Sequence, residues 1–431
     1  LNQQNKRLSP SYFAIWNTTN PNQLNRTKHY TISELRACSW AYNQDAYRIF
    51  LKYPQNTFRG LENISGDYNG LMRREAYAIL LHHLFKTMDE GKHEIVSIHV
   101  VFAVDPDISC KEKYIMNEII KLSGAHLKMI IDSPSAAANL YALEKKQLYA
   151  KSPKTVVFVD VGARKTWMSV FSFKSTPGNP IVKQLSIISN ISIGGDFADQ
   201  KLANFFIQKF SKDINFTLPF PKRVELLFLD EARKIKERLS LHSTVDVKIE
   251  DAFMDKTFEC TITREQFEKL ISDFNETLSH AYIKLIDEAN LFRSDIDSIE
   301  IIGGSSRVPI IMNSIQDVFN VSFIGHSLNA DESLCIGAGY YSQFLNGISK
   351  FRKVMIQTHQ SLYNITLKLS DNETFPVCEY NGTCIENITI NNTITKFELI
   401  YENANTSLLK TNSFGYKVDM KPNSTLLLRF S

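Results

Sequence analysis

Residues 154–173 have the sequence Lys-Thr-Val-Val-Phe-Val-Asp-Val-Gly-Ala-Arg-Lys-Thr-Trp-Met-Ser-Val-Phe-Ser-Phe. The β-branched and aromatic run 156–159 predicts a buried strand. Asp160 follows where this strand leaves the core, and Gly162 then permits a tight turn. Because the apolar pattern resumes from Thr166, we expect a β-hairpin. A strand, a carboxylate and a glycine turn commonly form a phosphate or metal cradle, although a plain hairpin with a solvated Asp160 has the same pattern.

Other motifs of the chain have the order and spacing of a known family. They are Pro-Ser-Ala-Ala-Ala at 134–138, Ile-Gly-Gly-Asp-Phe at 193–197, Ile-Glu-Ile-Ile-Gly-Gly-Ser-Ser-Arg-Val-Pro-Ile-Ile at 299–311, Asn-Ala-Asp-Glu-Ser at 329–333 and Ile-Gly-Ala-Gly at 336–339. From about Arg7 to Leu345 the chain resembles the heat-shock protein 70 superfamily of actin-like ATPases. The segments 1–10 and 231–236 favour its large lumenal branch, the hypoxia up-regulated or large glucose-regulated chaperones.

The resemblance implies an α/β fold: an actin-like, ribonuclease H-like nucleotide-binding domain of two lobes, followed by a small, mostly β domain. We expect lobe I at 1–153 without its N-terminal hairpin, lobe II at 154–330, and a closing helix at 331–347. A linker at 348–356 and an incomplete, substrate-binding-like β-sandwich at 357–431 would follow. Without the hairpin, the first lobe's sheet should have an unpaired edge beside Tyr12–Trp16.

The hydrophobic pattern independently indicates an α/β lobe, because strands alternate with amphipathic helices. Strands are predicted at 94–104, 128–131, 182–188 and 299–302, and helices at 73–88, 109–122, 196–210, 223–239 and 263–288. Ser109 with Glu112, and Thr263 with Gln266, have capping-box spacing. From residue 351 the pattern changes to short alternating segments, which predict half-exposed antiparallel strands.

The composition limits the classes of partner that the chain is expected to bind. A net charge of +3 over 431 residues, without a basic block, does not indicate nucleic-acid binding. The longest apolar run, 95–104, is too short to cross a bilayer, so we expect no membrane insertion. Because residues 2–7 are mostly polar, the sequence pattern does not predict a signal peptide at residues 1–10.

Asparagine usage indicates the compartment. Fourteen of the thirty-two asparagines begin an Asn-x-Ser/Thr sequon, whereas chance would give about five. This favours a glycoprotein of the secretory pathway, although an Asn- and Thr-rich genome would have the same effect. Cys378 and Cys384 flank a turn-like segment that a disulfide could close, with Cα atoms within about 7 Å. The remaining cysteines are predicted to be buried thiols, and no spacing indicates a metal site.

The adenosine side of the family's site is retained. Gly303 and Gly304 would let the backbone lie against an adenosine, and Arg307 could stack on the base. The resemblance adds further cofactor-binding positions, with a solvent-exposed helix face as the alternative for Lys236 and Ser240: Gly162, Lys165, Gly194, Gly195, Lys236, Ser240, Ser305 and Asp331.

The hydrolytic side is degenerate. The family loop Asp-x-Gly-Gly-Gly-Thr-x-Asp is represented by residues 160–167, in which Lys165 replaces the threonine and Trp167 the second aspartate. Ser133 stands where relatives have a glutamate. Hydrolysis in this family needs a cation held through carboxylates. Asp160 is therefore the one candidate catalytic residue, ATP or ADP should bind weakly, magnesium is doubtful, and Lys165 would neutralise phosphate charge.

The leading hypothesis is an adenine-nucleotide-binding, chaperone-like protein of the endoplasmic reticulum lumen. Its partners would be unfolded polypeptides, as a holdase, and the lumenal heat-shock protein 70, as a nucleotide-exchange factor. The alternative is an interaction scaffold whose degenerate cleft binds no nucleotide. A sugar kinase of the same superfamily fits the 303–309 segment less well. Whether the chain is an ATPase stays open, because its catalytic residues are largely replaced.

Overall fold

The computed structural model describes residues 12–17, 38–42, 57–59, 67–68, 71–89, 97–177, 179–191, 193–319, 325, 327–345, 354–358, 364–369, 374–378, 387–390, 396–402, 412–417 and 426–429. They form two compact units, each assembled from segments distant in the sequence. The first unit takes 1–102, 108–130 and 195–274, and the second takes 103–107, 131–194 and 275–431. The α/β class is confirmed. The domain boundaries implied by the resemblance divide the chain differently and stay predictions.

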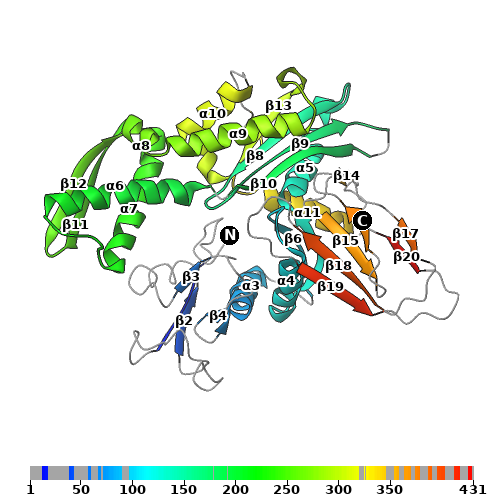
Figure 1. Cartoon of the computed structure of the whole chain (residues 1–431), viewed down its shortest axis with the longest axis horizontal. Coiled ribbons are helices and arrows are strands. Elements are labelled where there is room, and N and C mark those ends of the chain that lie inside the picture. The colour runs from blue at the N-terminus through cyan, green and yellow to red at the C-terminus, as the bar shows by residue number, and fades with distance from the viewer. Residues whose placement is uncertain are drawn as a thin grey trace. The chain divides into compact units, whose positions relative to one another are not determined.

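The second unit is built on a five-stranded mixed sheet in the order β13-β8-β9-β10-β14. Its strands are β8 (Lys154–Val161), β9 (Thr166–Lys174), β10 (Ile181–Ile191), β13 (Ser298–Ile302) and β14 (Met355–Thr358) (Figure 1). β8 and β9 form the predicted antiparallel hairpin, and β13 lies parallel to β8. The buried β-branched run of β8 therefore occupies an interior position in the sheet, between β13 and β9.

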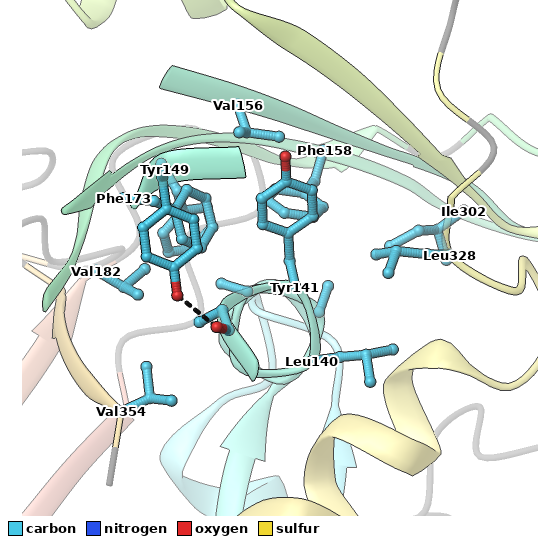
Figure 2. Close-up of a cluster of buried hydrophobic side chains, with 14 of the residues drawn as sticks. Leu140, Tyr141, Tyr149, Val156, Phe158, Phe173, Val182, Ile302, Leu328 and Val354 are labelled. Atoms are coloured by element: carbon cyan, nitrogen blue, oxygen red, sulfur yellow. Dashed lines mark hydrogen bonds between the residues drawn. The ribbon is translucent and has the colours of Figure 1, made fainter. Parts of the chain in front are cut away.

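Helix α5 (Ser133–Glu144) packs on this sheet. Figure 2 shows Tyr141 pointing from this helix toward Phe158 of the sheet, and the Tyr149 hydroxyl donating to the carbonyl of Ala142. The other helices of the unit are η2 (Lys146–Tyr149), α9 (Ser272–Glu288, which starts in the first unit), η3 (Arg293–Asp295), η4 (Gly304–Arg307), α10 (Pro309–Phe319) and α11 (Ser333–Leu345).

The first unit contains a core between α3 (Arg73–Asp89), α4 (Cys110–Leu122) and the paired strands β6 (His99–Val104) and β7 (His126–Asp132). Each of these strands begins in the first unit and ends in the second. The predicted capping box begins α4: the Glu112 N–H donates to Ser109 Oγ, and the Ser109 N–H donates to the Glu112 carboxylate. β6 begins later than predicted.

The remaining part of this unit differs from the sequence prediction in two places. The predicted helix 263–288 is two helices, α8 (Arg264–Leu270) and α9, which are interrupted at Ile271. An antiparallel hairpin that was not predicted, β11 (Thr244–Phe253) with β12 (Lys256–Thr263), follows the helices α6 (Gly195–Asp213) and α7 (Lys222–Leu241).

The expected unpaired edge near the N-terminus is wrong. β1 (Tyr12–Asn17) pairs antiparallel with β2 (Cys38–Tyr42) on one side and with β3 (Thr57–Arg59) on the other. The two short strands supply backbone partners on both sides of β1. β4 (Asp67–Tyr68) and β5 (Leu71–Met72) form a separate pair.

The C-terminal segment is β in every described stretch. A four-stranded antiparallel sheet has the order β16-β15-β18-β19, and β17 pairs with β20. Their bounds are β15 (Asn364–Leu369), β16 (Thr374–Cys378), β17 (Asn387–Ile390), β18 (Lys396–Glu402), β19 (Asn412–Lys417) and β20 (Leu426–Arg429). The predicted disulfide lies outside the described residues, because these include no Cys384. Cys335 is exposed, so its predicted burial is wrong.

Candidate functional site

Asp160 is the penultimate residue of β8 and lies opposite Trp167 of β9 and Ile302 of β13 in the sheet register. Its side chain is buried. Burial raises the pKa of the Asp160 carboxyl to about 7, and the negative charge of Asp105 acts in the same direction. A hydrogen bond from Trp167 opposes both effects. The Asp160 carboxyl therefore keeps its proton to a higher pH than an ordinary aspartate does.

The glycine turn after β13 lies directly against Asp160. Gly303 has φ +80°, and a β carbon there would lie 2.3 Å from Asp160 Oδ1 and 2.5 Å from the carbonyl oxygen of Val161. The Gly303 N–H donates to the carbonyl of Ala330 at 3.1 Å. Only glycine fits this position, since it combines a positive φ with backbone at contact distance. The structure thus brings together two motifs that are more than 140 positions apart in the sequence.

The short helix η4 follows this turn. Its Arg307 forms an ion pair with Asp331, which lies shortly before α11. Arg307 Nη2 lies 2.8 Å from Asp331 Oδ2, and a β carbon on Gly304 would lie 3.8 Å from both side chains. Ser305 is buried. The carboxylate holds the Arg307 guanidinium by one edge, while the side chain remains 59% exposed. A planar, positioned and accessible guanidinium is suited to stacking on an aromatic base.

Lys165 is not a free cation. Its Nζ lies 2.7 Å from Asp107 Oδ2 and 3.9 Å from Asp105 Oδ2. The loop that carries it is tight, because the Gly162 N–H donates to the carbonyl of Lys165 at 3.1 Å. Gly194 lies against the same loop: a β carbon there would be 2.5 Å from the carbonyl oxygen of Ala163.

The other predicted residues, Gly195, Lys236 and Ser240, belong to the first unit. Lys236 is buried, and its Nζ lies 2.7 Å from Asp199 Oδ1 and 3.2 Å from the carbonyl oxygen of Gly195, the first residue of α6. Arg233 approaches the same carboxylate from α7, with Nε 3.4 Å from Asp199 Oδ2. Ser240 donates to the carbonyl of Lys236 within its own helix. Lys236 is therefore part of a buried ion-pair cluster, not of a solvated helix face.

The carboxylates that pair with Lys165 and Lys236 were not identified from the sequence. Asp105 and Asp107 form an Asp-Pro-Asp segment directly after β6, which was a usable signal because polar residues at the ends of strands often line sites. Asp199 lies one turn into α6, and nothing in its sequence context indicates that it pairs with a lysine on α7.

The residues present do not fit the divalent cation that the family implies. The Asp107 carboxylate is occupied by the Lys165 ammonium, and Trp167 replaces one of the family's carboxylates. Across the described residues, no three or more His, Cys, Asp or Glu side chains are arranged to hold a metal ion. Within the same residues, no helix is both long and apolar enough to span a bilayer.

Comparison with known proteins identifies the family of the chain. The family model described as Hsp70 protein matches residues 62–402. Heat shock protein 70 homolog lhs1 of Schizosaccharomyces pombe is 25% identical over 73% of this chain and 38% of its own length. Heat shock 70 kDa protein 17 of Arabidopsis thaliana is 24% identical, over 63% and 32%. Heat shock cognate 70 kDa protein 3 of Dictyostelium discoideum is 28% identical, over 52% and 35%.

The chain thus spans about a third of the length of these curated relatives. The matched region covers most of the chain, including the hairpin of Asp160, the glycine turn at Gly303 and helix α11. It also confirms the predicted actin-like fold class. The chain belongs to the heat-shock protein 70 family.

Proposed function

We propose that this chain is a chaperone-like protein of the endoplasmic reticulum lumen that binds adenine nucleotide weakly and hydrolyses it negligibly. It acts as a holdase for unfolded polypeptides, as an exchange partner of the lumenal heat-shock protein 70, or as both. Family membership and the similarity to lhs1 support the chaperone role. The resemblance of 231–236 to the large lumenal branch supports the compartment.

One observation supports nucleotide binding most directly: the turn at Gly303 is packed against Asp160, with Arg307 positioned by Asp331. The exposed backbone of the turn and an accessible guanidinium provide a surface for an adenosine. Weak hydrolysis follows from the other end of the site. Asp160 is buried and partly neutral, and Lys165 is paired to Asp107, so these residues supply neither a metal-binding carboxylate nor an uncommitted positive charge.

Thermal unfolding with added adenosine, ADP or ATP tests this proposal, because a ligand that binds only the folded state raises the midpoint. We expect similar, small rises for all three. Arg307→Ala should remove most of the rise, corresponding to about 1 kcal/mol of binding. Arg293→Ala, which replaces another exposed arginine of the same unit, is the matched control and should leave the rise unchanged. No rise with any ligand would favour the interaction scaffold.

The lumenal location has a separate test. Among the sequons, Asn215-Phe216-Thr217 lies in a turn after α6, where Asn215 has φ 52° and both Asn215 and Thr217 are exposed. A glycan attached there would remain outside the folded core. In cells that secrete the chain, peptide N-glycosidase should increase its gel mobility, and Asn215→Gln should reduce that change by one glycan. An unglycosylated product would argue against passage through the lumen.

The chaperone role is tested by adding the chain to a heat-aggregating client protein and following light scattering. Suppression of aggregation at near-equimolar ratio is the expected result. Release of labelled ADP from the lumenal heat-shock protein 70 tests the exchange role separately. If neither activity is observed, the chain is not a chaperone of this type.

A further inference from the structure

The strongest unexplained feature of the second unit is the cluster of charges around the loop 162–165. The Asp105-Pro106-Asp107 segment follows β6 and faces the loop, and Lys165 Nζ lies 2.7 Å from Asp107 Oδ2 and 3.9 Å from Asp105 Oδ2. The Asp107 side chain is only 10% exposed. A carboxylate so far removed from water requires a positive partner, and the lysine of the loop supplies it.

The position of this lysine is set by the backbone and not by a flexible side chain alone. The carbonyl of Lys165 accepts from the Gly162 N–H, and the next residue, Thr166, donates from Oγ1 to the carbonyl of Ile193 at 2.7 Å. Gly194 approaches the loop so closely that any side chain there would collide with Ala163. The tightly packed turn therefore holds the Lys165 ammonium beside the carboxylates of Asp105 and Asp107.

The Lys165 ammonium competes with any divalent metal ion for these carboxylates. A magnesium or calcium ion needs carboxylate oxygens at about 2.0–2.6 Å, and the ammonium already occupies the Asp107 oxygen at hydrogen-bonding distance. The negative charge of Asp105 also raises the pKa of the Asp160 carboxyl. The Lys165 ammonium is thus paired with Asp107 and lies near Asp105, at the end of the site that contains Asp160.

We infer that the Lys165 ammonium replaces the divalent cation of the family at this end of the site, so that the folded chain does not need a metal there and binds one only weakly. The inference deepens the proposed function, because it makes any nucleotide binding independent of magnesium. Its test uses no nucleotide, so it can fail while the proposed function survives, and the reverse is equally true.

The experiment is titration of the purified chain with Mn²⁺, followed by the loss of the free-ion electron paramagnetic resonance signal. The wild type should bind weakly. Lys165→Met frees the carboxylates of Asp107 and Asp105 from their lysine and should bind Mn²⁺ at least about tenfold more tightly, since the number of charged ligands sets affinity. Lys165→Arg keeps the positive charge and should behave as wild type.

Lys183→Met, which removes an exposed lysine from β10 in the same unit, is the control for loss of charge and should also behave as wild type. Adding Asp107→Asn to Lys165→Met should abolish the gained affinity. Circular dichroism checks folding of each variant, and Lys165→Gln replaces Lys165→Met if the latter does not fold. Equally tight Mn²⁺ binding by wild type, or no gain on removing Lys165, would overturn the inference.

Discussion

Replacing Gly303 with alanine tests the arrangement on which the site depends. Gly303 has φ +80°, a conformation that costs an L-residue about 1–2 kcal/mol. The added β carbon would also lie 2.3 Å from Asp160 Oδ1 and 2.5 Å from the Val161 carbonyl oxygen. Because one of these atoms belongs to a buried strand backbone, relief requires movement of β8, and overpacking of this kind costs about 1–3 kcal/mol. Together we expect Gly303→Ala to lower the free energy of unfolding by about 3 kcal/mol or more.

Urea unfolding followed by circular dichroism measures this change. The matched control is Gly339→Ala in α11, where an added β carbon meets no heavy atom within 4 Å. Alanine should there stabilise the helix by about 0.5–1 kcal/mol. Both substitutions replace glycine with alanine, but the predicted changes in the free energy of unfolding have opposite signs. If Gly303→Ala were within 1 kcal/mol of wild type, the packing of the glycine turn on Asp160 would be wrong.

Two further substitutions test the buried charges. The folded-state pKa of Asp160, about 7, exceeds its ordinary 3.8, so the folded state retains a proton that the unfolded state loses, and stability should fall as pH rises from about 4 to 7. Asp160→Asn should remove this decline and raise the free energy of unfolding by up to about 4 kcal/mol at pH 8. If the variant's stability had the same pH dependence as that of wild type, this prediction would be wrong. Lys236→Met leaves the buried carboxylate of Asp199 with Arg233 alone, and should cost about 2–3 kcal/mol in urea unfolding. Lys234→Met, which replaces an exposed lysine of the same helix, should lower the free energy of unfolding by less than about 0.5 kcal/mol. Equal losses in the two variants would show that the buried pair of Lys236 contributes no more to stability than an exposed lysine does.

The parts of the fold that follow from local sequence were predictable. The β-branched run before Asp160 and the resumed pattern after it predict the β8–β9 hairpin, because both strands are buried. Ser109 and Glu112 have the spacing of a capping box, which is complete within four residues. The hairpin β11–β12 was missed although Val245, Val247 and Ile249 alternate as a half-buried strand should.

The parts that depend on distant neighbours were not predictable. The edge beside β1 was predicted to be open because the resemblance lacked the family's N-terminal hairpin. The strands that flank β1 are only 5 and 3 residues long, too short to show a hydrophobic period, so they were not predicted. The glycine turn and Arg307 were identified by their resemblance to the family motif. The partners of Lys165 and Lys236 were not identified. Those of Lys165 lie at the end of a strand, which was a usable signal, whereas Asp199, the partner of Lys236, lies on another helix and carries no local signal.

Isothermal titration calorimetry with adenosine, ADP and ATP, each with and without Mg²⁺, tests the central claim most directly. The claim is that the turn at Gly303 and Arg307 keeps a surface for adenosine while Lys165 has displaced the cation. It predicts weak binding of all three ligands, with dissociation constants within about tenfold of one another, a difference of 1.4 kcal/mol. Magnesium should have no effect, and ATP should remain intact. Micromolar, magnesium-dependent binding of ATP, with turnover that is lost in Asp160→Asn, would contradict the account.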